Sequence, residues 1–271
     1  MKKIFSYIFF IYISAFIISF IITYSYAEVI SAKAIMEKVD ERDDGDNMIF
    51  NMEMILIDKR NKSRHRMMKI FSKDFGKDIY TLMFFIKPAD VKDTSFLTYD
   101  YHGDKDDDQW LYLPALHKTK RIASNDKSTS FMGSDFSYAD LTSPEIENYN
   151  YRLLKQQEVN GFKTWLIESI PKTKKIVDEY GYKKSILFVR QDNYVIIRAV
   201  HWMNEGSKIK YLDIKKIEKI DGIWTPLEIT MTTKKGKIFD HKTILKYHDM
   251  KYNQNVDKDI LTVRRMEKGI W

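Results

Sequence analysis

Residues 47–57, with the sequence NMIFNMEMILI, decide the fold class of this chain. The apolar side chains of this stretch recur at every second position, at Met48, Phe50, Met52, Met54 and Leu56. Polar residues such as Asn51 and Glu53 lie between them. Because successive side chains of a β-strand point to opposite faces, this alternation predicts a strand with one buried and one solvated face.

Strand signals continue to the end of the chain. Turn sequences such as Asn160-Gly161, Asp221-Gly222 and Lys235-Gly236 separate the candidate strands. We expect these further strands at residues 63–72, 78–87, 94–101, 109–113, 118–123, 149–157, 163–170, 184–190, 194–203, 208–220, 224–233 and 237–247. Short connections between successive strands predict an antiparallel meander.

One helix is predicted ahead of the first strand. Ser31 can cap a helix that runs to about residue 39, with Ala32, Ile35 and Met36 on one face. With so few helices, the inner face of the sheet must be buried by curling it into a barrel or half-barrel, or by packing two sheets together. A curled sheet of this size encloses space that can hold a ligand.

Residues 1–27 are typical of a cleavable export signal. Met1-Lys2-Lys3 is basic, residues 4–22 are almost continuously apolar, and Ser25-Tyr26-Ala27 fits a small-x-small cleavage pattern. We therefore expect residues 28–271 to form a single exported domain. The alternative is an uncleaved membrane anchor, because the apolar run is nearly long enough to cross a bilayer.

The composition excludes several classes of protein. The 271 residues are 44% apolar and 31% charged, with 45 Lys and Arg against 38 Asp and Glu. These values do not fit a disordered, collagenous or polytopic membrane protein. The chain has no cysteine, which excludes disulfides, Cys-ligated zinc and cysteine nucleophiles. Basic stretches at residues 118–121, 172–175 and 215–216 suggest attraction to anionic lipid headgroups or membrane surfaces, and we expect no nucleic-acid partner for an exported chain.

The segment from Asp100 to Leu141 is the most distinctive part of the sequence. An acidic cluster runs into QWLYLP at residues 109–114, and KTKRIAS at 118–124 and FMGSDFSY at 131–138 follow. In these motifs the chain resembles the outer membrane lipoprotein-sorting proteins, LolA-like periplasmic carriers often found beside RND-type (MMPL-like) lipid exporters. The motifs DDGD at residues 43–46, KPADVKDT at 87–94 and DGIWTP at 221–226 also match, whereas residues 260–262 depart from the family pattern.

This resemblance implies a mainly β fold: a strongly curved, unclosed antiparallel β-barrel of the LolA/LolB type, with an N-terminal helix and short helices that plug its mouth. It also implies a hydrophobic cavity that carries acyl chains of lipids or lipoproteins through the periplasm between the two membranes. It implies no catalytic residue, and we expect no cofactor and a monomer. The implied partner is an inner-membrane RND-type transporter.

The strand alternation supplies candidates for the cavity lining. They are Phe50, Met52, Met54, Leu56, Phe84, Leu97, Trp110, Tyr112, Trp202 and Met231. Methionine suits such a wall because its unbranched, polarisable side chain adapts to irregular partners, although each Met can equally be an ordinary core residue. The inward face is not determined where both faces are apolar, as at residues 79–86.

A long segment without strand signals, residues 124–141, carries Phe131, Met132, Phe136 and Tyr138. Long loops in compact domains are often functional, and these are large apolar groups for a solvated loop. We interpret the segment as a rim or lid over the cavity, or as a docking surface for a membrane partner. The alternative is a structural flap that tucks back onto the sheet.

Signals for metal binding are weak. Asp104, Asp106 and Asp108 alternate like the first half of an EF-hand loop, but the required Gly and distal Glu are missing, so we expect a solvated hairpin tip. The histidines lack H-E-x-x-H spacing, and His117 and His241 have the pattern of solvent-facing strand residues. We therefore expect no metal.

Three functions are compatible with these patterns. The first is a carrier that shields acyl chains. The second is a non-catalytic accessory or structural subunit of an RND-type export complex, with an interior filled by its own side chains. The third, an exported hydrolase, has no motif behind it, because Gly133-Ser134-Asp135 lacks the second Gly of a nucleophile elbow. We therefore expect a protein that is not an enzyme.

Overall fold

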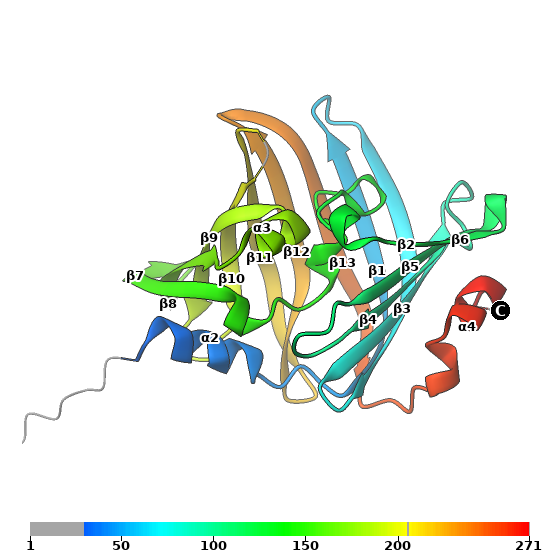
Figure 1. Ribbon diagram of the computed structural model, residues 1–271, viewed down its shortest axis with the longest axis horizontal. Helices are drawn as coiled ribbons and strands as arrows, with labels where there is room; N and C mark the ends of the chain where they lie inside the picture. Colours follow the sequence, from blue (N-terminus) through cyan, green and yellow to red (C-terminus); the bar gives the residue numbers. More distant parts are fainter. Residues whose placement is uncertain (1–29, 205, 271) are drawn as a thin grey trace, which may run out of the picture. The chain divides into compact units, whose positions relative to one another are not determined.

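A computed structural model describes residues 30–204 and 206–270 of the chain (Figure 1). From Ala32 onward the chain forms one compact unit. The predicted export signal and its cleavage site lie outside the described residues. Within the described ranges, no helix has both the length and the apolar character needed to cross a membrane.

Thirteen strands form one antiparallel sheet in the order β6-β5-β4-β3-β2-β1-β13-β12-β11-β10-β9-β8-β7. The strands are β1 (Asn47–Asp58), β2 (Ser63–Phe75), β3 (Asp78–Lys87), β4 (Ser95–Asp100), β5 (Asp108–Leu113), β6 (Lys118–Arg121), β7 (Tyr149–Val159), β8 (Phe162–Pro171), β9 (Tyr182–Arg190), β10 (Ile196–Met203), β11 (Lys208–Ile220), β12 (Ile223–Lys235) and β13 (Ile238–Tyr252). Among the described residues β6 pairs only with β5 and β7 only with β8, so the sheet is not closed. The predicted unclosed antiparallel barrel is confirmed.

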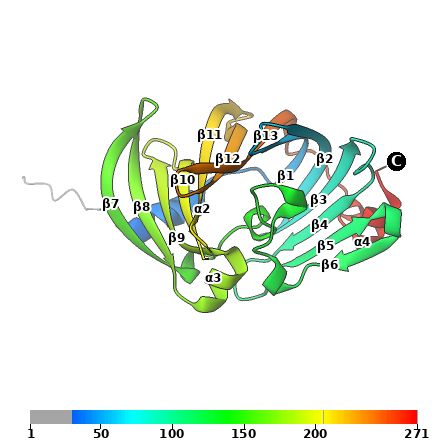
Figure 2. The ribbon, with the colours of Figure 1, turned by 90° about the horizontal axis from the view of Figure 1, so that it is seen from above.

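The sheet curls around the segment that joins its two edge strands (Figure 2). This segment, residues 122–148, contains the short 3₁₀ turns η2 (Ser124–Asp126), η3 (Phe131–Gly133), η4 (Ala139–Leu141) and η5 (Ile146–Asn148). We call it the plug loop. It packs onto the concave face of the sheet, where Phe131 is fully buried and Asp135 donates its backbone N–H to the Thr243 hydroxyl. The short plug helices expected from the family resemblance are these turns.

Within the described residues, three α-helices lie at the margins of the sheet (Figure 1). α2 (Ala32–Asp40) matches the predicted helix, buries Ala32, Ile35 and Met36, and contacts β7. α3 (Lys174–Tyr180) begins at Thr173, whose side chain accepts a hydrogen bond from the Ile176 backbone N–H, and ends at Gly181 in the left-handed conformation. α4 (Val263–Lys268) contacts β4 and β5 near the C-terminus. The hydrophobic pattern did not reveal α3 and α4, because these helices are too short to show a clear helical period.

Candidate functional site

An apolar cavity of about 150 Å³ lies between the concave face and the plug loop. The sheet provides most of its wall and the plug loop provides the rest. The lining residues are Phe50, Met52, Met54, Ile70, Thr81, Met83, Phe96, Thr98, Phe131, Phe136, Leu141, Leu245 and Tyr247. Only two threonine hydroxyls and one tyrosine hydroxyl interrupt the apolar character of these side chains, which is typical of a site for a hydrocarbon ligand.

The period of two in β1 positions three of these side chains. Phe50, Met52 and Met54 point to the concave face, and antiparallel pairing places Met52 opposite Met68 on β2 and Met54 opposite Leu245 on β13. Thioether side chains on adjacent strands give this wall an adaptable surface.

Aromatic rings of the plug loop cover the cavity. The Phe131 ring lies 5.0 Å from the Phe96 ring and 5.5 Å from the Tyr138 ring, measured between centroids. The Phe131 ring also lies 6.2 Å from the Phe85 ring of β3. These separations allow the tilted and edge-on packing that aromatic pairs favour, so the loop is held as part of the core.

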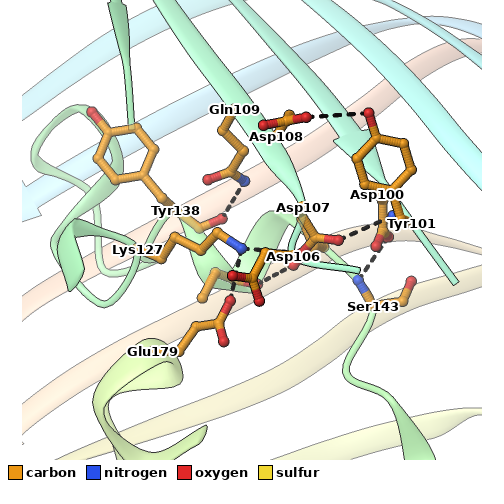
Figure 3. A network of polar contacts seen from close by, with 12 residues as sticks. Asp100, Tyr101, Asp106, Asp107, Asp108, Gln109, Lys127, Tyr138, Ser143 and Glu179 are labelled. Atoms are coloured by element: carbon orange, nitrogen blue, oxygen red, sulfur yellow. Dashed lines mark hydrogen bonds and ion pairs between the residues drawn. The ribbon is translucent and has the colours of Figure 1, made fainter. Parts of the chain in front are cut away.

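A buried cation fastens one end of the plug loop (Figure 3). The Lys127 side chain is only 1% exposed, and its Nζ atom lies 2.7 Å from Glu179 Oε1 of α3 and 3.4 Å from Asp107 Oδ2 of the β4–β5 turn. Nearby, Gln109 Nε2 of β5 donates to the Tyr138 carbonyl at 2.9 Å. A buried charge is tolerated only when it is paired, so this contact specifies where the loop sits.

The next carboxylate along this network carries an altered pKa (Figure 3). Burial, and secondly the nearby charge of Asp107, raise the pKa of Asp100 to about 7. Asp100 Oδ2 also accepts the backbone N–H of Ser143 at 2.8 Å, which ties the sheet to the far end of the plug loop. This attachment therefore changes its charge near neutral pH.

A second buried carboxylate holds the middle of the plug loop. Asp135 accepts hydrogen bonds from the hydroxyls of Thr233 and Thr243. His241 Nδ1 lies 2.6 Å from Asp135 Oδ2. The Arg66 guanidinium of β2 donates to the Met132 carbonyl of the same loop. The loop is thus attached to β2, β12 and β13 by polar contacts at its centre.

A third contact places a polar group at the edge of the concave face. The Tyr182 hydroxyl lies 2.8 Å from Asp140 Oδ2 of the plug loop, and burial, followed by the charge of Asp140, raises the pKa of Tyr182. Stacked on this ring at 4.6 Å, His201 has its pKa lowered to about 4 by burial. The imidazole is therefore neutral at physiological pH, and it forms a 2.8 Å hydrogen bond with the Ser185 hydroxyl.

Five of the ten predicted lining residues lie in the concave core. They are Phe50, Met52, Met54, Leu56 and Met231. The first three line the cavity itself, whereas Leu56 and Met231 pack in the same cluster next to it. For β1, the alternation of polar and apolar residues was enough to identify the inward face.

The other five predicted lining residues lie elsewhere, which corrects the sequence prediction. Four of them pack on the outer face of the sheet beneath the C-terminal segment: Phe84, Leu97, Trp110 and Tyr112. Their strand neighbours Met83 and Phe96 face the cavity instead. Because β3 and β4 are apolar on both faces, the period of two gave no basis for choosing between them. Trp202 is adjacent to His201 in β10 and so points to the opposite face, where Lys184 Nζ lies 4.5 Å from its ring.

The four apolar residues predicted to form a rim, lid or docking surface are Phe131, Met132, Phe136 and Tyr138. Phe131, Phe136 and Tyr138 are buried, so their side chains do not form an exposed docking surface. Met132, with φ of 50°, is half-buried at the turn of the loop. The loop tucks back onto the sheet as in the flap alternative, and it also covers the cavity.

Among the weak metal candidates, Asp106 and Asp108 form ion pairs, and His241 makes a half-buried contact with the plug loop. Asp106 pairs with Lys175 at 2.8 Å and Asp108 pairs with Arg121, so part of the acidic hairpin tip is neutralised by basic side chains. His117 is exposed as expected, but His241 is not, because it binds Asp135 of the plug loop. No group of three or more His, Asp or Glu side chains in residues 30–204 and 206–270 is placed to hold a metal ion.

A family model with the description "Uncharacterized protein" matches residues 77–268. No curated protein matches the sequence significantly. The chain is similar to the crystal structure of a domain described as an outer membrane lipoprotein-sorting protein from Vibrio parahaemolyticus, with 31% identity, a TM-score of 0.79, and coverage of 87% of this chain and 98% of that one.

Two further solved structures are similar over the same region. A DUF1329 family protein from Desulfovibrio piger has 28% identity and a TM-score of 0.78, with coverage of 87% of this chain and 97% of that one. A LolA superfamily protein from Nitrosomonas europaea has 19% identity and a TM-score of 0.65, with coverage of 87% and 99%. At this identity, the last comparison shows a shared fold.

Proposed function

Because the chain belongs to the family of outer membrane lipoprotein-sorting protein domains and has a LolA-like fold, we propose that it is a periplasmic carrier for the acyl chains of lipids or lipoproteins. In this proposal, the concave face and the plug loop shield the chains from water while the protein ferries them between the inner and outer membranes. The carrier has no catalytic role. Its donor is an energised inner-membrane transporter of the RND type.

The observation that carries the proposal is the apolar cavity under the plug loop. Each buried methylene contributes about 0.8 kcal/mol, so an acyl chain of about 16 carbons costs on the order of 12 kcal/mol to expose to water. Free diffusion of such a chain between membranes is therefore negligible. A carrier needs an interior nearly as apolar as the bilayer, and the side chains that line this cavity meet that need.

The volume of the cavity limits the size of the ligand that fits while the plug loop is in place. A dry apolar cavity of about 150 Å³ in a protein core accepts a ligand as small as benzene. The cavity observed here has that size, so a long acyl chain requires the plug loop to move outward. The polar contacts of Lys127, Asp135 and Asp140 hold the loop down until cargo replaces its aromatic rings.

The second candidate function, a non-catalytic subunit of an export complex, draws support from the same core. Phe131 and Phe136 of the plug loop already fill much of the concave face. If this packing is permanent, the protein presents a surface to a transporter and binds no lipid. The two candidates therefore differ in whether the interior opens.

The test is a lipid-binding measurement on the exported protein with two matched variants. Leu245→Phe adds bulk inside the cavity, whereas Leu97→Phe adds the same bulk on the outer face. Both substitutions overpack the core and are expected to destabilise the fold by about 1–3 kcal/mol. We expect only Leu245→Phe to weaken the binding of a fluorescent fatty acid, by about tenfold.

A second measurement uses the protein purified from the periplasm. We expect mass spectrometry of organic extracts to detect co-purifying lipid. If no lipid co-purifies and the fluorescent fatty acid does not bind, the carrier proposal is wrong. Capture of a transporter by such an empty protein would then support the accessory function.

A further inference from the structure

A polar cleft of about 550 Å³ lies beside the plug loop, at the end of the sheet where β1 meets β2 and β11 begins. It is separate from the apolar cavity and larger. Side chains of β1, β11, β12, β13 and the plug loop line it, and they include Lys59, Arg60, Lys208, Lys210 and His241.

The plug loop forms a thin partition between the cleft and the cavity. Phe131 and Phe136 face the apolar cavity. Ser130 and the run from Gly133 to Asp135 face the polar cleft. Within one short segment the side chains thus divide by polarity. A ligand with an apolar tail and a polar head would find matching surroundings on the two sides of this segment.

The three carboxylates of the cleft are already engaged. Asp58 accepts the backbone N–H groups of Arg60 and Lys62 at 2.7 and 3.0 Å. Asp135 accepts two threonine hydroxyls and lies against His241. Asp240 pairs with Lys208 at 2.8 Å. Among the described residues, none of these carboxylates forms an ion pair with Lys59, Arg60 or Lys210.

Within the described part of the chain, the three other cations of the cleft lack an ion pair as close as that of Lys208 with Asp240. Lys59 and Arg60 are exposed at the β1–β2 turn and form no ion pair among the described residues. Lys210 is buried, and among the described residues its Nζ atom contacts the Tyr182 hydroxyl at 3.2 Å, the Tyr182 ring at 5.2 Å from its centroid, and Asp140 Oδ2 at 3.8 Å. Burying an ammonium group with such long contacts is costly, so an anion in the cleft would be stabilised by it.

The Asp135–His241 contact fixes an imidazole ring at the wall of the cleft. Asp135 occupies Nδ1 of the ring, so Nε2 is left on the side of the ring away from the carboxylate. His241 lines the cleft and keeps 22% of its side chain exposed. A carboxylate behind an imidazole fixes the orientation of the ring.

We propose that this cleft binds the acidic headgroup, a phosphate or a carboxylate, of the amphiphile whose acyl chain enters the adjacent cavity. The inference rests on the proposed carrier function and narrows its cargo to anionic amphiphiles. Lys59 and Arg60 at the β1–β2 turn attract the headgroup, and Lys210 contacts it inside. The plug loop shifts so that the tail replaces the rings of Phe131 and Phe136.

Isothermal titration calorimetry of the exported protein with three probes tests this inference. Decyl phosphate carries both the tail and the charge, decanol carries the tail alone, and glycerol phosphate carries the charge alone. The variant combines Lys59→Ala and Arg60→Ala, and the control combines Lys155→Ala and Lys163→Ala. The control residues are exposed on β7 and β8 and form no ion pair among the described residues.

We expect the wild-type protein to bind decyl phosphate about tenfold more tightly than decanol. The Lys59/Arg60 variant should bind decyl phosphate about fivefold more weakly while its affinity for decanol is unchanged. The Lys155/Lys163 control should behave as the wild type. All four substituted residues are exposed, so the thermal unfolding temperature should be the same in each protein.

Each result that contradicts the inference has its own interpretation. Equal affinity of the wild type for decyl phosphate and decanol would overturn the headgroup site and leave the carrier function standing. If the Lys59/Arg60 variant bound decyl phosphate and decanol more weakly by the same factor, the headgroup site would also be overturned and the carrier function would stand. If neither decyl ligand binds, the carrier function is wrong. Binding of glycerol phosphate alone would then show an anion site with no acyl partner, which contradicts the inference.

Discussion

Two irregular segments cover the sheet, one on each face, and they are held in different ways. The plug loop lies on the concave face and is attached through buried charges, with Lys127 paired to Glu179 and Asp135 bound by His241. The C-terminal segment lies on the outer face, where Leu261 and Met266 pack among apolar side chains of β3 and β4.

The polar contacts of the two covers also differ. On the outer face, the Ser95 hydroxyl donates to the Met266 carbonyl at 2.7 Å and the Tyr99 hydroxyl donates to the Leu261 carbonyl at 2.8 Å. These two contacts join neutral groups. Lys73 Nζ of β2 adds a third contact by donating to the Val256 carbonyl at 2.9 Å, and all three supplement continuous apolar packing. Buried charges, in contrast, depend strongly on their partners and on pH. A cover held by such charges is suited to opening, whereas a cover held by apolar packing is suited to permanent closure.

The largest effect is expected from removing the buried cation of the plug loop. Lys127→Ala leaves Glu179 and Asp107 without their buried partner, which should lower the free energy of unfolding by about 3–5 kcal/mol. The matched control is Lys175→Ala, because Lys175 forms an exposed ion pair with Asp106 and should change stability by less than about 0.5 kcal/mol. Urea unfolding measures both. A loss below about 1 kcal/mol for Lys127→Ala would show that the loop does not depend on this charge.

A pair of phenylalanines compares the two covers directly. Phe131 in the plug loop and Phe84 beneath the C-terminal segment are both almost completely buried. Replacement of either by Ala should cost about 3–4 kcal/mol, because both create a cavity. Only Phe131→Ala enlarges the cavity of the concave face, so only this variant should bind a fluorescent fatty acid more tightly. The same gain in Phe84→Ala would contradict the assignment of the acyl site to the concave face.

The attachment of the plug loop through Asp100 should make the stability of the protein depend on pH. The pKa of Asp100 is about 7 in the folded protein and about 3.9 for an unperturbed side chain. Between these pH values the folded state binds more protons than the unfolded state, so stability falls as pH rises from about 4 to about 7. The loss is on the order of 1–2 kcal/mol for this partly solvated group.

Substitution of Asp100 should reduce this pH dependence. In Asp100→Asn the free energy of unfolding should change less between pH 5 and pH 8 than in the wild type. The matched variant is Asp74→Asn, since burial, with a smaller effect of Asp44, raises the pKa of Asp74 to about 6 at a site away from the plug loop. Hydrogen exchange at Ser143 distinguishes the two: Asp100→Asn should change its pH profile and Asp74→Asn should leave it unaltered.

The sequence predicted the sheet well, because its signal is local. In β1, polar residues such as Asn51 and Glu53 mark the outward face, so the inward set could be identified. In β3 and β4 both faces carry large apolar groups, and the choice of Phe84 and Leu97 as lining residues was wrong. The outer apolar face exists because the C-terminal segment covers it, and no pattern within β3 or β4 reveals a cover that is supplied from so far along the chain.

The attachments of the plug loop could not be predicted for the same physical reason. The number of apolar groups in residues 124–141 indicated that the segment has special surroundings. Its partners are remote in the sequence, as Asp135 meets His241 and Thr243 on β13 and Lys127 meets Glu179 on α3. A charged residue in a loop looks solvated until the fold places an opposite charge beside it. His241 was misread for this reason.

The smallest effect is expected on the outer face. Tyr99→Phe removes the hydroxyl that donates to the Leu261 carbonyl but keeps the ring in its apolar cluster. The loss of one hydrogen bond between neutral groups should lower the free energy of unfolding by about 1 kcal/mol. The control is Tyr112→Phe in the same cluster, where the described residues provide no hydroxyl partner, and its stability should be unchanged. Because the C-terminal cover is held mainly by apolar packing, neither variant should alter fatty-acid binding. A change in binding for Tyr99→Phe would mean that the outer cover is coupled to the cavity, and the two faces of the sheet would then act together.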